Sequence, residues 1–150
     1  MQPIEISDSD YTKLAKTLRR VDFFKPLDLD QLSKAIPFIL LFYYEDGETV
    51  FKAGADGDAF YIVCSGSVDV MVSKWPMGLF PKTVATLQEG QFFGEMALFS
   101  KEKRNATVLA NGKTKLFVLL KKEFDRFLNE NPGFKEKVEQ IVNRRGLQNK

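Results

Sequence analysis

The chain has 150 residues, of which 44% are hydrophobic, and its 22 basic and 20 acidic side chains give a formal net charge of +2. This length predicts one domain around one core, and the small net charge provides no strong overall attraction to nucleic acid or to an anionic membrane. The chain contains no histidine, which excludes histidine triads and HExxH zinc sites, so we expect no metal or other cofactor.

The N-terminal part, about residues 7–36, is predicted to be helical. Apolar residues recur at three- and four-residue intervals from Tyr11 to Leu18, which is the period of an amphipathic helix. A second short helix is predicted after Asp28, because Asp28 is a suitable N-cap and Gln31 completes a capping-box pattern. These helices are expected to lead into a β-barrel.

Residues 38–120 have the pattern of short β-strands separated by glycine turns. Asp46 and Gly47 predict a hairpin, because both turn positions tolerate positive φ. Ser65 and Gly66 predict another turn, between an apolar run and a strand of alternating valines. Further strands are predicted at 84–87, 107–110 and 115–120. Many short strands at this spacing indicate a sandwich or a small barrel.

From about residue 121 to 146 the helical period returns. The last helix is predicted to begin at Pro132, with Asn131 as its N-cap, and to end at Gly146. Two arginines near its C-terminus complement the helix dipole. The apolar face of this helix comprises Phe134, Val138, Ile141 and Val142.

The segment 74–82, KWPMGLFPK, is predicted to be a hairpin loop that is unusually rich in apolar side chains. If these side chains are exposed, they form a surface for a protein partner; alternatively, they fold back onto the domain. The residues concerned are Trp75, Met77, Leu79 and Phe80.

Several features predict a cytoplasmic location. Cys64 is the single cysteine of the chain, so it cannot form an internal disulfide, and the N-terminus lacks a secretion signal. The longest apolar run, at 38–44, is far shorter than the roughly 20 residues of a membrane helix. We therefore expect a cytoplasmic protein with no membrane span in this chain.

The stretch FFGEMALFSKEKRNATV, residues 92–108, combines the groups that a small phosphorylated ligand requires. Gly94 allows a tight turn, and the helical turn expected after it presents unpaired amides to an anion. Arg104 adds a charged fork that can bind two phosphate oxygens. Glu95 is useful beside a phosphate only if it accepts a hydrogen bond from a group such as a sugar hydroxyl. The stretch therefore predicts a ligand with one phosphate and a free hydroxyl.

These residues resemble the phosphate-binding cassette of the cyclic nucleotide-binding domain family, found in catabolite activator proteins, regulatory subunits of cAMP-dependent kinase and gated channels. The resemblance covers roughly residues 15–145. It implies a mainly β fold: an eight-stranded jelly-roll β-barrel with N-terminal helices and a C-terminal helical lid. The ligand-binding residues that it implies are Phe93, Gly94, Glu95, Met96, Ala97, Leu98, Arg104, Asn105, Ala106 and Thr107.

The resemblance also implies roles for individual residues. Glu95 would accept from the ribose 2′-hydroxyl, Arg104 would pair with the cyclic phosphate, and the amides of Ala97 and Leu98 would hold phosphate oxygens. The function implied is a regulatory sensor that binds cAMP or cGMP and couples binding to movement of the C-terminal helix, with an unknown effector downstream.

Two positions depart from the family pattern. Lys103 stands where many members have proline, and Asn105 stands where alanine often accompanies a cAMP preference and threonine a cGMP preference. The amide of Asn105 can both donate and accept, so it does not decide between the two bases.

The role of the last helix is open at this stage. Its apolar face would form a lid over the base or simply pack on the barrel, and its arginines would stack on the base or remain solvated. The candidate lid residues are Phe134, Val138, Ile141, Arg144 and Arg145.

Other interpretations of the chain remain. The FGE motif could be an ordinary turn at the end of a strand, with Arg104 paired to Glu95 or Glu102 on the surface. Separately, the chain could be a degenerate family member that keeps the fold without the ligand and acts as a protein-interaction module. An enzyme with Glu95 as general base would lack a second placed carboxylate, a histidine or a metal site, so we expect no enzymatic activity. A regulator that binds DNA directly would need a helix-turn-helix, and only about five residues follow Arg145.

Overall fold

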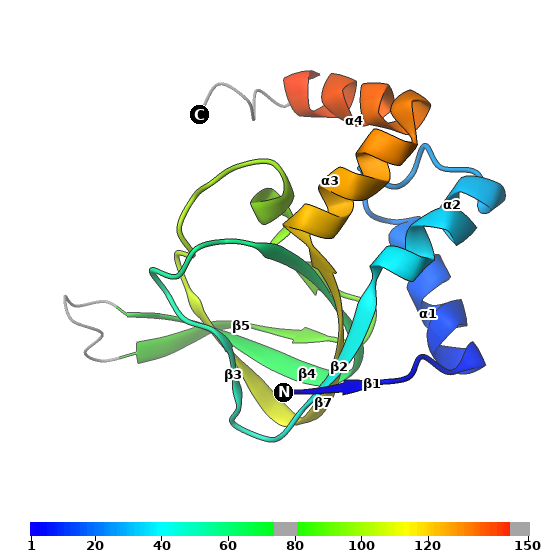
Figure 1. Cartoon of the computed structure of the whole chain (residues 1–150). Helices are drawn as coiled ribbons and strands as arrows, with labels where there is room; N and C mark the ends of the chain where they lie inside the picture. Colours follow the sequence, from blue (N-terminus) through cyan, green and yellow to red (C-terminus); the bar gives the residue numbers. More distant parts are fainter. Residues whose placement is uncertain (74–80, 145–150) are drawn as a thin grey trace.

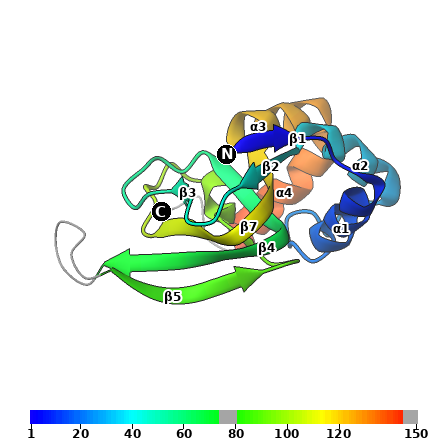
Figure 2. The same ribbon diagram turned by 90° about the horizontal axis from the view of Figure 1, so that it is seen from below.

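The computed structural model describes residues 1–73 and 81–144. Its described residues form a curved antiparallel sheet, with the helices gathered at one end (Figures 1 and 2). The strands are β1 (Gln2–Ile4), β2 (Leu40–Tyr44), β3 (Thr49–Phe51), β4 (Ala59–Ser73), β5 (Pro81–Gln88), β6 (Phe92–Phe93) and β7 (Thr107–Leu120). The helices are α1 (Asp8–Leu18), α2 (Leu29–Ala35), α3 (Lys121–Glu130) and α4 (Pro132–Arg144), with 3-10 turns η1 (Ile36–Phe38) and η3 (Glu95–Leu98).

The sheet is organised around β4 and β7. Its described strands follow the order β1-β2-β7-β4-β5, while β3 also pairs with β7 and β6 with β4. The two central strands pair from Ala59–Leu120 at one end to Met71–Thr107 at the other. The prediction of a mainly β fold with flanking helices is therefore confirmed, but β1 and β5 end the order without pairing to each other, so the sheet is not a closed barrel.

The predicted number of eight strands is wrong for the described residues, which form a seven-stranded sheet. Gly66 has φ of 82° but lies inside the continuous 15-residue strand β4, where the register with β7 shifts around Ser65. Gly112, with φ of 79°, likewise lies inside β7. Positive φ serves a bulge as well as a turn, so glycine in the sequence did not distinguish a bent strand from a broken one.

The hairpin predicted at Asp46 and Gly47 is also wrong, although the turn itself is present, with φ of 79° at Gly47. The strands on either side, β2 and β3, pair with β7 and not with each other. The amide of Gly47 donates to the carbonyl of Ala110 at 2.8 Å, and the amide of Ala110 donates to the carbonyl of Glu48 at 2.9 Å. The turn therefore carries the chain from one end of β7 to the other.

The predicted helices are confirmed with one local correction. Asp28 caps α2 and forms the capping box with Gln31, and α4 begins at Pro132. The side chain of Asn131, however, donates to the carbonyl of Phe127 at 2.9 Å and so bonds the end of α3, while its backbone carbonyl accepts from the Lys135 amide at 3.0 Å in the first turn of α4. Gly146, Arg145 and the apolar side chains of the 74–80 loop lie outside the described residues.

Alternation along β4 divides the core into two clusters. Phe60 and Ile62 belong to the cluster that includes the helices, whereas Tyr61 and Val63 belong to a second cluster on the other face of the sheet. This alternation follows from the two-residue period of a strand. One face of the sheet is therefore covered by helices, and the other is free to line a cavity.

A buried carboxylate attaches α1 to the sheet. Asp10 accepts hydrogen bonds from Lys115 Nζ at 3.0 Å, from the Cys64 thiol at 3.3 Å and from the Ser7 amide at 3.1 Å. Burial alone would raise the pKa of Asp10, but these hydrogen bonds outweigh it and lower the pKa to about 2. The same environment raises the pKa of Cys64 to about 12, mainly through burial.

The first prediction concerns acid stability. Because the folded pKa of Asp10 is depressed, its stabilisation is complete above about pH 4 and is lost as the pH falls towards 2, by about 2 kcal/mol. Urea unfolding of Asp10→Asn should show a lower stability at pH 7 and a flatter decline between pH 4 and 2. Asp30→Asn, at an exposed site on α2, should keep the wild-type decline; an Asp10→Asn profile parallel to wild type would contradict the assignment.

The second prediction tests the bulge in β4. A Cβ at Gly66 would lie 2.4 Å from the carbonyl oxygen of Lys113, whereas a Cβ at Gly112 would have no atom within 4 Å. Both substitutions strain a positive φ, so Gly112→Ala should lower the free energy of unfolding by about 1 kcal/mol and Gly66→Ala by about 3 kcal/mol, measured by urea denaturation. Equal losses would show that the close approach is unimportant.

Candidate functional site

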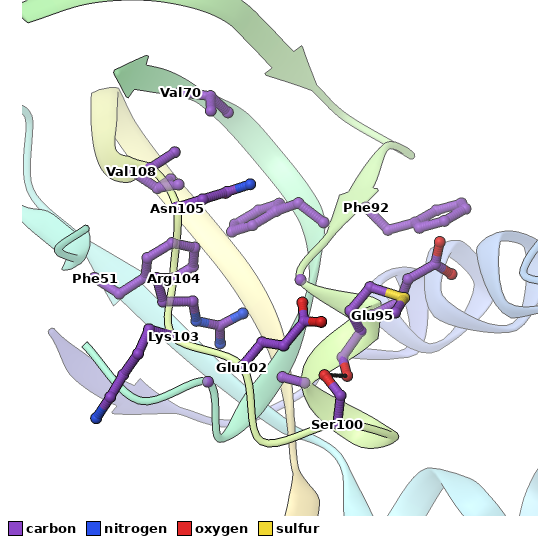
Figure 3. A pocket seen from close by; sticks show the side chains of 16 residues that line it. Phe51, Val70, Phe92, Glu95, Ser100, Glu102, Lys103, Arg104, Asn105 and Val108 are labelled. Atoms are coloured by element: carbon purple, nitrogen blue, oxygen red, sulfur yellow. Dashed lines mark hydrogen bonds between the residues drawn. The ribbon is translucent and has the colours of Figure 1, made fainter. Parts of the chain in front are cut away.

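A cavity of about 350 Å³ lies on the face of the sheet opposite the helices, between β3, β4 and the segment 92–108 (Figure 3). Eight of the ten predicted ligand-binding residues line it: Phe93, Gly94, Glu95, Met96, Ala97, Arg104, Asn105 and Ala106. The other two do not. Leu98 is buried in the cluster with the helices, and the hydroxyl of Thr107 accepts from the Ala53 amide at 3.0 Å.

The sequence reasoning missed eight further lining residues: Phe51, Gly57, Val70, Phe92, Ser100, Glu102, Lys103 and Val108. The alternation of side chains along a strand could have identified Val70 and Val108 as residues of the same face, since they are direct neighbours across β4 and β7. No pattern of alternation could have placed Gly57 at the cavity, because it lies in the loop before β4. Its place depends on tertiary packing, because a Cβ there would lie 3.1 Å from the Glu102 carbonyl and 3.2 Å from the Ala97 Cβ.

The turn before η3 depends on Gly94. Its φ of 78° is unfavourable for other residues, and a Cβ there would lie 2.9 Å from Nη1 of Arg104. Glycine therefore lets the guanidinium approach the backbone. The amide of Ala97 donates to the Gly94 carbonyl at 3.1 Å, so this amide is engaged within the turn.

The backbone of Arg104 is fixed by the loop that precedes β4. Its amide donates to the carbonyl of Ala55 at 2.8 Å, and its carbonyl accepts from the amide of Gly54 at 2.7 Å. Lys103, which stands in place of the family's frequent proline, forms an ion pair with Asp56, and these two residues also form a β-bridge. Two segments about 50 residues apart thus hold the arginine at the wall of the cavity.

The guanidinium of Arg104 lies over the ring of Phe51, with 4.1 Å between Cζ and the ring centroid. Nη2 donates to the carbonyl of Ala59 at 2.7 Å, whereas Nε is buried and has no hydrogen-bond partner among the described residues. Burial lowers the pKa of Arg104, but a guanidinium remains charged at neutral pH. The site therefore holds a partly desolvated cation with an unused donor.

The interpretation that Arg104 pairs with a surface carboxylate is wrong for the described residues. Neither Glu95 nor Glu102 forms an ion pair with it, although both line the same cavity. A buried polar group without a partner is costly, so the unpaired Nε is a feature of the site that calls for an explanation.

Glu95 begins η3 and is half-buried. Burial raises the pKa of its carboxyl group, and within residues 1–73 and 81–144 no donor forms a hydrogen bond to it. A carboxylate with unused lone pairs can accept from a hydroxyl group. Glu95 and Arg104 therefore offer the cavity an acceptor and a cationic donor.

The candidate lid residues lie elsewhere. Phe134, Val138 and Ile141 are buried in the cluster with the helices and do not line the cavity. The ring of Phe134 packs 6.1 Å from that of Phe24 and 5.4 Å from that of Phe127, measured between centroids. Arg144 is exposed at the end of α4. In this conformation α4 packs on the body of the domain and does not cover the cavity.

Two further observations concern other kinds of site. Among the residues that the structure describes, no three aspartate, glutamate or cysteine side chains gather where they could hold a metal ion. No helix in the same residues is both long and apolar enough to cross a bilayer.

A profile of the family described as "Cyclic nucleotide-binding domain" matches residues 41–131, which include β2 apart from its first residue, β3 to β7 and the whole of the cavity wall. The chain belongs to the cyclic nucleotide-binding domain family. Family members with known roles are similar over most of this chain. This chain is 39% identical over 111 residues to a cAMP-dependent protein kinase regulatory subunit of Mucor circinelloides f. lusitanicus, and the match covers 74% of this chain and 25% of the relative.

A second relative is cGMP-dependent protein kinase 2 of Homo sapiens, which is 37% identical over 93 residues, covering 62% of this chain and 12% of the kinase. The chain thus spans a quarter or less of the length of these two relatives.

Two solved structures have a similar fold. The regulatory domain of Toxoplasma gondii PKA, solved with cAMP, superposes with a TM-score of 0.70 at 28% identity, covering 92% of this chain and 49% of that one. The N-terminal domain of a transcriptional regulator from Streptomyces coelicolor A3(2) gives a TM-score of 0.76 at 29% identity, covering 86% and 89%.

Proposed function

We propose that this domain is a regulatory sensor that binds cAMP or cGMP in the cavity and responds by movement of its C-terminal helices. The observation that carries the proposal is the state of Arg104: a partly desolvated guanidinium with an unpaired Nε and no carboxylate partner among the described residues. The family membership and the kinship to cAMP- and cGMP-dependent kinases support the same ligand class.

The proposed ligand position follows from the charged and apolar parts of the cavity. Arg104 would bind the cyclic phosphate, and Glu95 would accept from the ribose 2′-hydroxyl. Val70, Val108 and Asn105 lie together at the end of the cavity away from Ser100 (Figure 3), where they would contact the base. The amides of Ala97 and Leu98 would complete the phosphate contacts, and Ala97 would then have to release or share its bond to Gly94.

The proposed coupling runs through Phe99, the residue directly after η3. Its ring lies 4.1 Å from that of Phe23 and 5.6 Å from that of Phe124 on α3, measured between centroids. At the other end of the cavity wall, the amide of Lys121 at the start of α3 donates to the carbonyl of Asp58 at 2.8 Å. A ligand that draws η3 inward would therefore change the packing of α3 and, through Phe127 and Phe134, that of α4.

The binding prediction is tested by calorimetry on protein freed of nucleotide by unfolding and refolding. Titration should give saturable binding near one per chain for cAMP or cGMP and much weaker binding for AMP. Arg104→Gln should weaken binding of the preferred cyclic nucleotide roughly a hundredfold or more, because it removes a charge-assisted fork. Arg126→Gln, on the exposed side of α3, is the matched control and should bind like wild type.

The same titration tests the principal alternative. If folded wild-type protein binds neither nucleotide, the domain is a degenerate member, and a role as a protein-interaction module gains support. Arg104→Gln is preferred to Arg104→Ala because the arginine also contacts Ala59 and Phe51, so truncation would cost some stability.

The coupling prediction is tested by hydrogen exchange. The amides of α4 should change their protection between the free and the saturated states, because movement of α4 must separate Phe134, Val138 and Ile141 from the core. The amides of β4 near the buried Val63, on the central strand pair, serve as the internal reference. Unchanged protection of α4 at saturation would contradict the lid mechanism.

Some expectations remain predictions. These are a cytoplasmic location, an effector outside this chain and the lack of enzymatic activity. Conversion of a cyclic nucleotide to its monophosphate by the pure protein would contradict the last of these.

A further inference from the structure

The cavity is lined by two carboxylates as well as by two cationic side chains, and carboxylates do not help to bind an anion. Its charged lining residues are Glu95, Glu102, Lys103 and Arg104. The ammonium of Lys103 points away from the cavity in Figure 3, and it forms its ion pair with Asp56. Of the two lining carboxylates, that of Glu102 lies on the side of Arg104, whereas that of Glu95 points away from the guanidinium, towards Phe92 (Figure 3).

The carboxylate of Glu102 points into the cavity on the side of Arg104 (Figure 3). The backbone of Glu102 lies close to the loop before β4, since a Cβ on Gly57 would be 3.1 Å from the Glu102 carbonyl oxygen. No hydrogen bond or ion pair holds the carboxylate to any of the described residues. Glu102 is therefore an unpaired negative charge near the place proposed for the phosphate.

The two carboxylates differ in what a ligand can offer them. Glu95 gains a hydrogen bond when a ligand brings a hydroxyl group, whereas a phosphate that pairs with Arg104 brings only further negative charge towards Glu102. The repulsion grows in proportion to the charge of the phosphate. A cyclic phosphate is a diester with one negative charge, whereas an open monophosphate carries about 1.5 to 2 negative charges at pH 7.

We infer that Glu102 determines specificity at this site by repelling the phosphate, so that it selects singly charged cyclic phosphates against open monophosphates. This inference rests on the proposed function, because it assigns a role to one wall residue of the same cavity. It also implies that the wild-type domain binds its cyclic ligand less tightly than its geometry would allow.

The test compares Glu102→Gln, which keeps the shape of the side chain, with wild type in calorimetric titrations of cAMP, cGMP and AMP. For the preferred cyclic nucleotide the variant should bind roughly three- to tenfold more tightly, as expected for removal of one partly screened charge beside the phosphate. For AMP the gain should be larger, because the free energy of repulsion scales with the ligand charge. The ratio of the AMP and cyclic-nucleotide dissociation constants should therefore fall.

Two controls separate this effect from a general change of charge or structure. Glu139→Gln, on the exposed face of α4, changes the net charge equally and should leave all dissociation constants within twofold of wild type. Raising the salt concentration should reduce the difference between Glu102→Gln and wild type, because screening weakens a charge effect.

The outcomes are distinct. An unchanged ratio of AMP to cyclic-nucleotide affinity in Glu102→Gln, with wild type binding normally, would overturn this inference and leave the proposed function intact. Weaker binding by the variant would also overturn it, since Glu102 would then assist the ligand. Binding by the variant but not by wild type would support it. If neither protein binds any nucleotide, the proposed function fails, and this inference fails with it.

Discussion

The pairing of β4 with β7 is the constraint on which the rest of the structure depends. These strands have 15 and 14 residues, and every other strand except β1 pairs with one of them. Because side chains alternate along β4, one set of residues meets the helices and the next set meets the cavity. A shift of one residue in their register would exchange the two sets and destroy the core and the cavity wall together. The two-residue period of this pair therefore determines which face of the sheet carries the cavity.

The helices were predictable because their signals are local. The capping box of Asp28 and Gln31 and the proline at the start of α4 each depend on residues within one helical turn. The strands were harder to predict because glycine has the same backbone freedom in a bulge as in a turn. Whether Gly66 bends or ends a strand depends on whether Thr114 and its neighbours lie alongside, which is decided by contacts almost 50 residues apart.

The candidate site shows the same division. The segment 93–106 could be predicted because its glycine, glutamate and arginine are close in the sequence, and they do gather at one cavity. The contact between the Arg104 guanidinium and the ring of Phe51 could not be predicted from the sequence. Phe51 comes from β3 and reaches the guanidinium only through the pairing of β3 with β7. The position of α4 was also undetermined, because an apolar helix face serves equally for a lid and for packing. The structure shows the packed arrangement.

The environment of Cys64 has a practical consequence. Its side chain is fully buried, its thiol donates to Asp10, and its pKa of about 12 leaves almost no thiolate at neutral pH. Since this is the single cysteine of the chain, the native protein presents thiol-reactive dyes with essentially no background. A cysteine introduced on the exposed side of α4 would be labelled selectively, without first removing the native one. The proposed motion of that helix can thus be tested by fluorescence in a protein that is otherwise wild type.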